Sequence, residues 1–382
     1  MTPIYLDYNA TTPVDPAVTE AVFPYLSEHF GNPSSSHAFG RTAHAAVDQA
    51  RRQVAELLGA QPDEILFTSG GSEASNHALK GLVFSQLRTF LGKWTRGAHV
   101  ITSAIEHPAT LQPCEFLRHL GCRISILPVD RHGRVDPDTV RKAIDRRTIL
   151  VSIMHANNEV GTLQPIREIA ALAHERGVLV HTDAAQSLGK IPVDVNELGV
   201  DLLSLAGHKL YAPKGVGALY VRRGVKLEPL IHGGGHEAGR RAGTENVPYI
   251  VALGVACALA RRSLPPATDR LRRLRDRLWE KLRASLGERV LLNGHPEQRL
   301  PNTLNVNFVD KIGAQLLQEA PEIAASTGSA CHEGAVCLSP VLEAMGVAPE
   351  LGRGAVRLSV GRYTNDEEVD RAAEVLAVRA KS

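Results

Sequence analysis

Between residues 63 and 223, short apolar runs rich in β-branched residues alternate with segments that carry apolar side chains at helical spacing. This alternation is typical of strand–helix–strand units, which build a mostly parallel sheet covered by helices on both faces. We therefore predict an α/β protein whose ligands bind at the carboxyl ends of its strands. The seven predicted strands are residues 65–68, 99–105, 123–128, 149–155, 179–182, 202–205 and 217–221.

The rest of the chain predicts a second, smaller unit. Helical patterns at residues 248–262 and 268–286 precede an α+β segment with strands at residues 303–308 and 356–360 and a closing helix from Asp366. We expect the N-terminal segment up to Pro13 to pack against this unit. The predicted organisation is a large domain of residues 14–260 and a small C-terminal α+β domain of residues 1–13 and 261–382.

The composition narrows the classes of partner. The 43 Lys and Arg nearly balance the 41 Asp and Glu, and without a charge block we expect neither nucleic acid nor a membrane surface as main partner. The sequence contains no run of about 18 apolar residues, so it predicts no membrane span, and the N-terminus lacks the pattern of a signal peptide. Five scattered cysteines do not suggest a disulfide framework. We therefore expect a reducing, cytoplasmic setting, which also permits a reactive thiol.

Two residues at predicted strand ends carry the main chemical signal. Lys209 follows one strand in the run Ala206-Gly207-His208-Lys209, and Asp183 ends the preceding strand, 26 residues earlier. Taken singly, a loop lysine is usually solvated and an aspartate at a strand end usually caps a helix. Together they match pyridoxal phosphate, which forms an imine with an amine and needs a carboxylate beside its pyridinium nitrogen.

Two further strand ends suit the same cofactor. The run Ser69-Gly70-Gly71-Ser72 is a glycine turn that opens a helix, where free backbone N–H groups bind phosphate. His107 follows another strand, from which it could lie over a cofactor ring and move protons. Each feature is common alone. Their combination at the edge of one sheet is much more specific.

With these residues in place, the chain resembles the cysteine desulfurases, fold-type I pyridoxal-phosphate enzymes that remove sulfur from L-cysteine. The resemblance spans residues 4–362 and implies the large seven-stranded domain and small domain described above. Residues 330–332, 339–342 and 357–362 are also similar to selenocysteine lyase. The stretches that carry the resemblance are residues 4–13, 31–35, 103–107, 155–159, 183–187, 207–209, 232–237, 241–244, 326–331 and 357–362.

The resemblance implies a role for each matching residue. Lys209 would bind the cofactor as a Schiff base and act as the base at Cα, and Arg357 would grip the substrate carboxylate. Family members often have a serine where this chain has Ala206, so phosphate binding is expected to rest on the other donors. The enzyme would be a homodimer with shared sites. The remaining implied roles are a pyridinium partner in Asp183, a ring-hydroxyl partner in Gln186, a stacking ring in His107, phosphate contacts from Gly71, Ser72, His208 and the partner subunit's Thr244, and substrate contacts from Asn32 and Asn158.

Cys331 is the candidate nucleophile. It lies in a run of small residues, beside His332, and a thiolate is suited to attack on a substrate sulfur. The resemblance implies a long cysteine loop, which would carry a persulfide to an acceptor protein for iron–sulfur cluster assembly or for tRNA or DNA modification. Cys337 could resolve that persulfide or pair with Cys331. The cluster Cys331-His332-Cys337 lacks a fourth ligand and the usual zinc spacing, so we predict no metal.

Three other functions stay open at this point. Selenocysteine lyase uses a softer version of the same chemistry, and an aminotransferase of the same fold would leave Cys331 incidental. A non-catalytic scaffold is disfavoured by the intact set of Lys209, Asp183, His107 and Cys331. A nicotinamide dehydrogenase is disfavoured because no G-x-G-x-x-G opens the first strand–helix unit.

Overall fold

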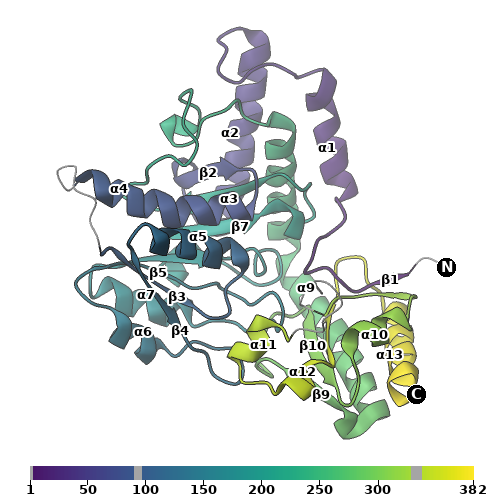
Figure 1. The fold of residues 1–382 in the computed structure, drawn as a ribbon. Helices are drawn as coiled ribbons and strands as arrows, with labels where there is room; N and C mark the ends of the chain where they lie inside the picture. Colours follow the sequence, from purple (N-terminus) through teal and green to yellow (C-terminus); the bar gives the residue numbers. More distant parts are fainter. Residues whose placement is uncertain (1–2, 90–96, 328–337) are drawn as a thin grey trace.

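The computed structural model describes residues 3–89, 97–327 and 338–382, and its centre is a seven-stranded sheet (Figure 1). The strand order is β2-β8-β7-β6-β5-β3-β4. β4, β3, β5, β6 and β7 run parallel, which confirms the mostly parallel sheet. The strands are β2 (Ile65–Thr68), β3 (His99–Ser103), β4 (Arg123–Leu127), β5 (Thr148–Ser152), β6 (Leu179–Asp183), β7 (Leu202–Ala206) and β8 (Gly217–Val221).

β8 is antiparallel to both of its neighbours, β7 and β2. Only residues 207–216 join β7 to β8, and a parallel crossover needs a dozen or more residues. The chain therefore returns directly beside β7. This short return carries Lys209 in the 3₁₀ turn η3 (Gly207–Lys209), at the carboxyl end of β7.

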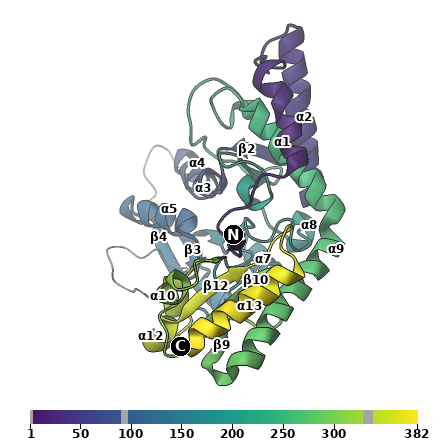
Figure 2. The same cartoon turned by 90° about the vertical axis from the view of Figure 1, so that its right-hand side faces the viewer.

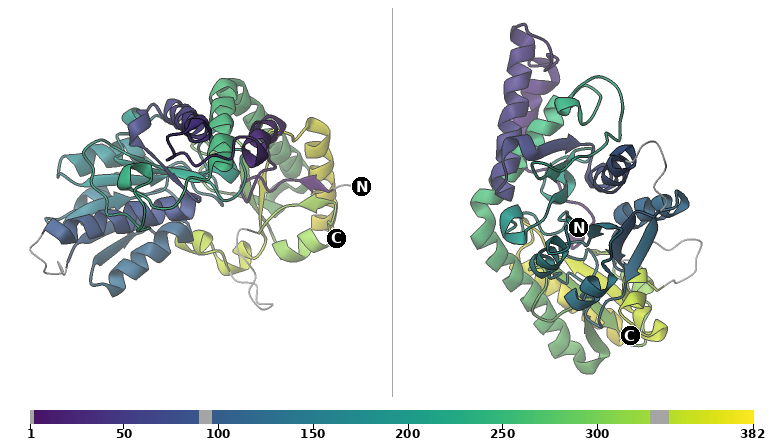
Figure 3. Two further views of the ribbon diagram at one scale, coloured as in Figure 1. Left: turned by 90° about the horizontal axis from the view of Figure 1, so that it is seen from above. Right: turned by 90° about the vertical axis from the view of Figure 1, so that its left-hand side faces the viewer.

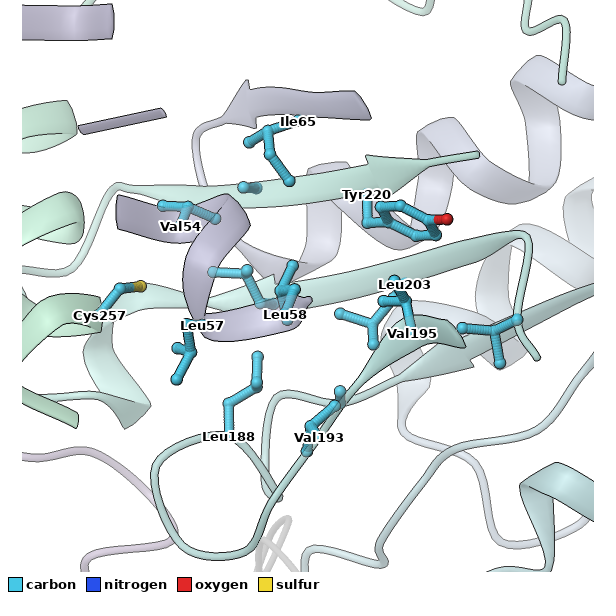
Figure 4. Packing of buried hydrophobic residues seen from close by; sticks show 14 of the residues in the cluster. Val54, Leu57, Leu58, Ile65, Leu188, Val193, Val195, Leu203, Tyr220 and Cys257 are labelled. Atoms are coloured by element: carbon cyan, nitrogen blue, oxygen red, sulfur yellow. The ribbon is translucent and has the colours of Figure 1, made fainter. Parts of the chain in front are cut away.

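Helices cover both faces of the sheet. Successive residues of a strand point to opposite faces, and the strands carry apolar side chains on both, so each face needs a covering layer. On one face, Leu66 and Leu219 join the buried cluster of α3 (Gly71–Asn76), α4 (Leu82–Thr89) and α5 (Pro108–His119). On the other, Ile65 and Tyr220 pack with Leu58 and further side chains of α2 (Ala38–Leu58) (Figure 4). The other helices around the sheet are α1 (Pro16–Ser27), α6 (Pro137–Ala143), α7 (Ile166–His174) and α8 (Val195–Leu198).

One helix, α9 (Val247–Leu286), replaces the two helices that we predicted at residues 248–262 and 268–286. Pro265 and Pro266 lie inside it, and each lacks the N–H that would bond four residues back. The carbonyls that lose this partner belong to Arg261 and Arg262, which are exposed, so water can satisfy them. The helix continues because its first half packs in the large cluster and its second half in another cluster.

The α9 region also contains a window apolar enough to cross a membrane, which the sequence analysis did not single out. The window lies within Val247–Arg289, has a mean hydropathy of 1.4 and is half buried inside the protein. Its buried residues contact α1 and α2. A core helix passes the same test of length and composition, and the packing of α9 is that of a core helix.

A second, antiparallel sheet has the order β12-β10-β9 and is covered by α13 and the end of α9 (Figure 2). Its strand β9 was not predicted. The N-terminal strand β1 pairs with β11, so Ile4 and Leu6 join the apolar cluster of this second sheet and α13. β1 and α13 lie at the same end of the molecule (Figure 3). The domain boundaries at residues 13 and 260 remain a prediction. The elements are β1 (Ile4–Tyr5), β9 (Val290–Asn293), β10 (Thr303–Phe308), α10 (Gly313–Gln318), β11 (Ile323–Ala324), α11 (Pro340–Ala344), α12 (Pro349–Gly352), β12 (Ala355–Ser359) and α13 (Asp366–Lys381).

Candidate active site

A cavity of about 410 Å³ lies at the carboxyl ends of the central strands, where we expected the ligand site. It gathers residues from the ends of five strands of the large sheet (β2, β3, β5, β6 and β7), from the N-terminal segment and from β12 of the second sheet. Most of the predicted site residues line it. These are Gly71, Ser72, His107, Asn158, Asp183, Gln186, His208, Lys209 and Arg357, and Ala206, where family members often have a serine, lines the cavity too.

The Lys209 amine lies against the N-terminal segment. Its Nζ donates hydrogen bonds to the carbonyl oxygens of Ala10, at 2.7 Å, and Asn9, at 2.5 Å. Burial, and then the positive charge of Arg357, lower the pKa of Lys209 to about 8, although Asp7 and Asp183 oppose the shift. With this pKa, a much larger fraction of the amine is neutral near physiological pH than in an ordinary lysine, and imine formation and proton abstraction both require the neutral form.

Asp183 ends β6 inside the same cavity. Burial raises the pKa of this carboxyl group, and the hydrogen bond from the Ala185 N–H, at 2.9 Å, and the charges of His107 and Lys209 work against that rise. A buried carboxylate is stable when a cation lies beside it. A protonated pyridine nitrogen is a cation of this kind.

His107 caps the N-terminus of α5. Its Nδ1 accepts the N–H of Ala109 at 3.1 Å, so the neutral ring carries its proton on Nε2. Burial, together with the charge of Lys209, lowers the pKa of His107, while Asp183 raises it. The lowered pKa favours the neutral form of the ring, whose flat face suits stacking on a cofactor.

One part of the cavity is formed by the turn that opens α3. Gly70 has φ of 151°, a conformation that favours glycine, and Gly71 and Ser72 open the helix with backbone N–H groups directed out of its first turn. A Cβ on Gly71 would lie only 3.2 Å from that of Ala206. This part can hold a phosphate. His208, whose Nδ1 lies 3.2 Å from Thr11 Oγ1, lies nearby on η3.

Arg357 reaches the cavity from β12. Its Nη2 contacts Asp7 Oδ1 at 2.7 Å and its Nη1 donates to the Asn158 carbonyl at 3.1 Å. Its buried Nε has no hydrogen-bond partner within the described part of the chain. Buried donors normally have a partner, so this one is available to an anionic substrate group.

The cavity fits pyridoxal phosphate. It offers an amine with a lowered pKa, a buried carboxylate, a flat neutral ring and a glycine turn for the phosphate, all on one lining. The unsatisfied Nε of Arg357 adds a place for a substrate carboxylate. Among the described residues, no group of three His, Cys, Asp or Glu is arranged to hold a metal ion.

Two predicted site residues lie outside this cavity. Thr244 is exposed and lines a separate hollow with Thr68 and Arg241. Asn32 is also exposed, and its Oδ1 accepts the N–H of Ser34 at 2.9 Å. Their roles stay predictions. The positions of Cys331, His332 and Cys337 lie outside the described residues.

Four polar residues around the cavity were not predicted from the sequence. Asn9 accepts hydrogen bonds from Lys209 and Gln186, Lys190 donates to Gln186, and Asp7 pairs with Arg357. Glu106 is fully buried and accepts from Ser103 Oγ and the Met154 N–H. Asp7 and Asn9 belong to the stretch of residues 4–13, which carried the resemblance without an assigned role. No pattern in the sequence singled out Lys190.

Similarity to known proteins defines the class of enzyme to which the chain belongs. The family model for the class-V aminotransferases matches residues 4–372. A solved structure described as a NifS-like protein superimposes with a TM-score of 0.90 at 38% identity and covers 99% of both chains. The fold is therefore fold type I of the pyridoxal-phosphate enzymes, and the cofactor is pyridoxal phosphate.

Individual relatives narrow this class. Cysteine desulfurase IscS of Dictyoglomus turgidum is 48% identical over 98% of this chain and 93% of its own length. The structure of SspA in complex with cysteine has a TM-score of 0.82 at 39% identity and covers 94% of this chain and 99% of that chain. The chain belongs to the cysteine desulfurases.

Proposed function

We propose that the chain converts L-cysteine to L-alanine and takes the sulfur as a persulfide on Cys331. The observation that carries the proposal is the shared cavity of Lys209, Asp183 and Arg357. An amine, a carboxylate for a pyridinium and a free guanidinium donor together fit an α-amino acid bound beside pyridoxal phosphate.

Each residue then has a task. Pyridoxal phosphate, when bound, withdraws electrons from the substrate Cα. Asp183 would hold the positive charge on its ring nitrogen, with His107 against the ring, Gln186 at the ring oxygen and Gly71, Ser72 and His208 at the phosphate. Arg357, with Asn158 beside it, would bind the substrate carboxylate. Lys209 would accept the Cα proton, because its lowered pKa makes the neutral amine more available than in an ordinary lysine.

The sulfur step needs no external oxidant. The Cys331 thiolate would attack the substrate sulfur, so that an S–S bond forms while the carbon–sulfur bond breaks. The electron pair of the broken bond stays with the carbon fragment, which gains a proton and leaves as L-alanine. The sulfur remains on Cys331 until a second thiol, on an acceptor protein, receives it.

We further propose a homodimer in a reducing, cytoplasmic setting. α1, the segment after it and the start of α2 expose the apolar side chains of Phe23, Leu26, Phe30 and Phe39, which are 55–68% accessible, and a second copy would cover them. Thr244 and Asn32 lie on the surface, from which they could reach the partner's cavity. Sulfur would pass to an acceptor protein for iron–sulfur cluster assembly or for tRNA or DNA modification.

Addition of L-cysteine to the purified protein tests the proposal. We expect alanine and persulfide in equal amounts in the first turnover, and the peptide that contains Cys331 should gain the mass of one sulfur atom. A run with L-selenocysteine distinguishes a selenocysteine lyase, which would prefer that substrate. Pyruvate-dependent amino transfer without release of sulfur would contradict the proposal in favour of an aminotransferase.

A further inference from the structure

A second lysine, Lys190, is enclosed beside the active-site cavity. It is only 7% exposed, and its Nζ donates to Gln186 Oε1 at 2.9 Å and to Asn9 Oδ1 at 3.4 Å. Both acceptors are carboxamide oxygens. No salt bridge joins Lys190 to a carboxylate within residues 3–89, 97–327 and 338–382.

The amine is not needed for packing. Lys190 lines a neighbouring, mostly apolar cavity of about 400 Å³ with Leu188, Leu271 and Val360, and Lys209 lines it too. Beside these apolar side chains, an apolar side chain of the same length would avoid the cost of burying an amine. Burial, and the charges of Lys209 and Arg357, lower the pKa of Lys190 well below the usual range of lysine. Burial of an amine costs free energy of desolvation, so the hydrogen bonds of Lys190 should explain why the amine is present.

Those contacts fix the side chain of Gln186. Its Nε2 donates to the Asn9 carbonyl at 3.0 Å, and its Oε1 accepts from Lys190. Together the two bonds select one of the two orientations of the carboxamide and leave one Nε2 hydrogen for another acceptor. Gln186 lines the Lys209 cavity, and the same Asn9 carbonyl also accepts from Lys209. Lys190 therefore lies one hydrogen bond from the cofactor residues without lining their cavity.

We propose that Lys190 is a positioning residue that holds the Gln186 carboxamide oxygen and so directs the Gln186 nitrogen donor at the ring oxygen of the cofactor. This inference rests on the proposed function, in which Gln186 binds that oxygen. Without the amine, Gln186 Oε1 would be buried without a donor, or the carboxamide would turn and present its oxygen to another oxygen.

A double-mutant cycle on cofactor binding separates this role from a general structural one. Apoprotein of the wild type, Lys190→Met, Gln186→Ala and the double variant would be titrated with pyridoxal phosphate, and the Kd read from the visible absorption. We expect each single change to weaken binding about 5- to 10-fold. The double variant should be no weaker than Gln186→Ala. Losses that multiply in the double variant would overturn the proposal, and so would an unchanged Kd in Lys190→Met.

The pH midpoint of the visible band provides a second readout. It should shift in the same direction in Lys190→Met and Gln186→Ala, and not further in the double variant; Lys209, Arg357 and His208 face Lys190 and are unchanged in all of them. A midpoint that moves in Lys190→Met but stays constant in Gln186→Ala would contradict the proposal.

Two controls keep the outcome clear. Lys142→Met, at an exposed position on α6, should bind the cofactor like the wild type. If circular dichroism shows that Lys190→Met does not fold, Lys190→Gln, which keeps a hydrogen-bond donor, replaces it in the cycle. We then expect a smaller loss of affinity for pyridoxal phosphate than in Gln186→Ala. A wild-type protein that binds no cofactor would contradict the proposed function itself. If the wild type binds the cofactor and the Lys190 variant binds it with the same Kd, only the role of Lys190 is contradicted.

Discussion

Asp7 Oδ1 lies 2.7 Å from Nη2 of Arg357, although 350 positions separate the two residues in the chain. The pair joins the N-terminal segment to β12 and fixes the plane of the guanidinium. Because Nη1 is held by the Asn158 carbonyl, the Nε, which has no partner among the residues that the structure describes, and the remaining Nη hydrogens are left for the substrate.

Replacement of Arg357 should therefore act mainly on substrate binding. We expect Arg357→Lys to raise KM for L-cysteine about 10- to 100-fold, with a smaller change in kcat, since a lysine cannot make the bidentate contact. Steady-state kinetics with Arg353→Lys, an exposed neighbour, as control checks this. An unchanged KM would show that the substrate carboxylate binds elsewhere.

The attachment of the cofactor should depend on pH through Lys209. Its pKa of about 8 belongs to the free amine of the apoprotein, and only the unprotonated amine reacts with an aldehyde. The rate of pyridoxal-phosphate attachment should therefore rise with pH and level off above about pH 8. Stopped-flow absorbance between pH 6 and 10 measures it. A rate still climbing at the upper end would mean that burial does not lower this pKa.

Glu106 should make the protein less stable as pH rises. Burial raises its pKa to about 8, from 4.5 in an exposed glutamate, although Ser103 and the Met154 N–H favour the charged form. The folded state therefore keeps a proton that the unfolded state releases. This contribution is fully present below about pH 4.5 and is lost as pH rises towards 8.

The variant Glu106→Gln removes this titration and keeps an oxygen that can accept the same hydrogen bonds. Between pH 5 and 8, urea unfolding should show stability falling less steeply in Glu106→Gln than in the wild type. Parallel slopes would indicate that Glu106 ionises with an ordinary pKa. Glu115→Gln, on the exposed side of α5, is the matched control.

The ends of the strands could be predicted because they depend on the hydrophobic pattern of neighbouring residues in the sequence. Alternation of apolar strands with helical patterns placed Asp183 and Lys209 at one edge of the sheet, and the structure brings both to one cavity. The continuous helix through Pro265 was not predictable, because only its packing at both ends keeps it intact. Lys190 was missed for a similar reason: its contact with Gln186 is local, but its burial depends on distant segments such as Asn9, which lies 181 positions away.

A substitution at Ala206 should strengthen the binding of pyridoxal phosphate. The Ala206 methyl group is buried at the end of β7 and lines the cavity beside Gly71, in the part assigned to the phosphate. Ala206→Ser would add a hydroxyl donor there, so we expect the Kd for pyridoxal phosphate to fall about 3- to 10-fold. Ala206→Val should instead weaken binding, because a larger side chain meets Gly71. Equal affinities in wild type and Ala206→Ser would place the phosphate away from β7.

Replacement of Cys331 separates cofactor chemistry from sulfur transfer. In Cys331→Ser the residues of the cavity are all intact, so the bound cofactor should keep its yellow colour, and the band should still respond to L-cysteine. Alanine production should fall at least about 100-fold, since a serine hydroxyl at neutral pH is a far weaker nucleophile than a thiolate. No persulfide should appear on the peptide of residue 331. Cys337→Ser is the matched control, and it should still gain one sulfur on Cys331. Full turnover in Cys331→Ser would move the nucleophile to another residue, and a persulfide found on Cys337 in that variant would identify it.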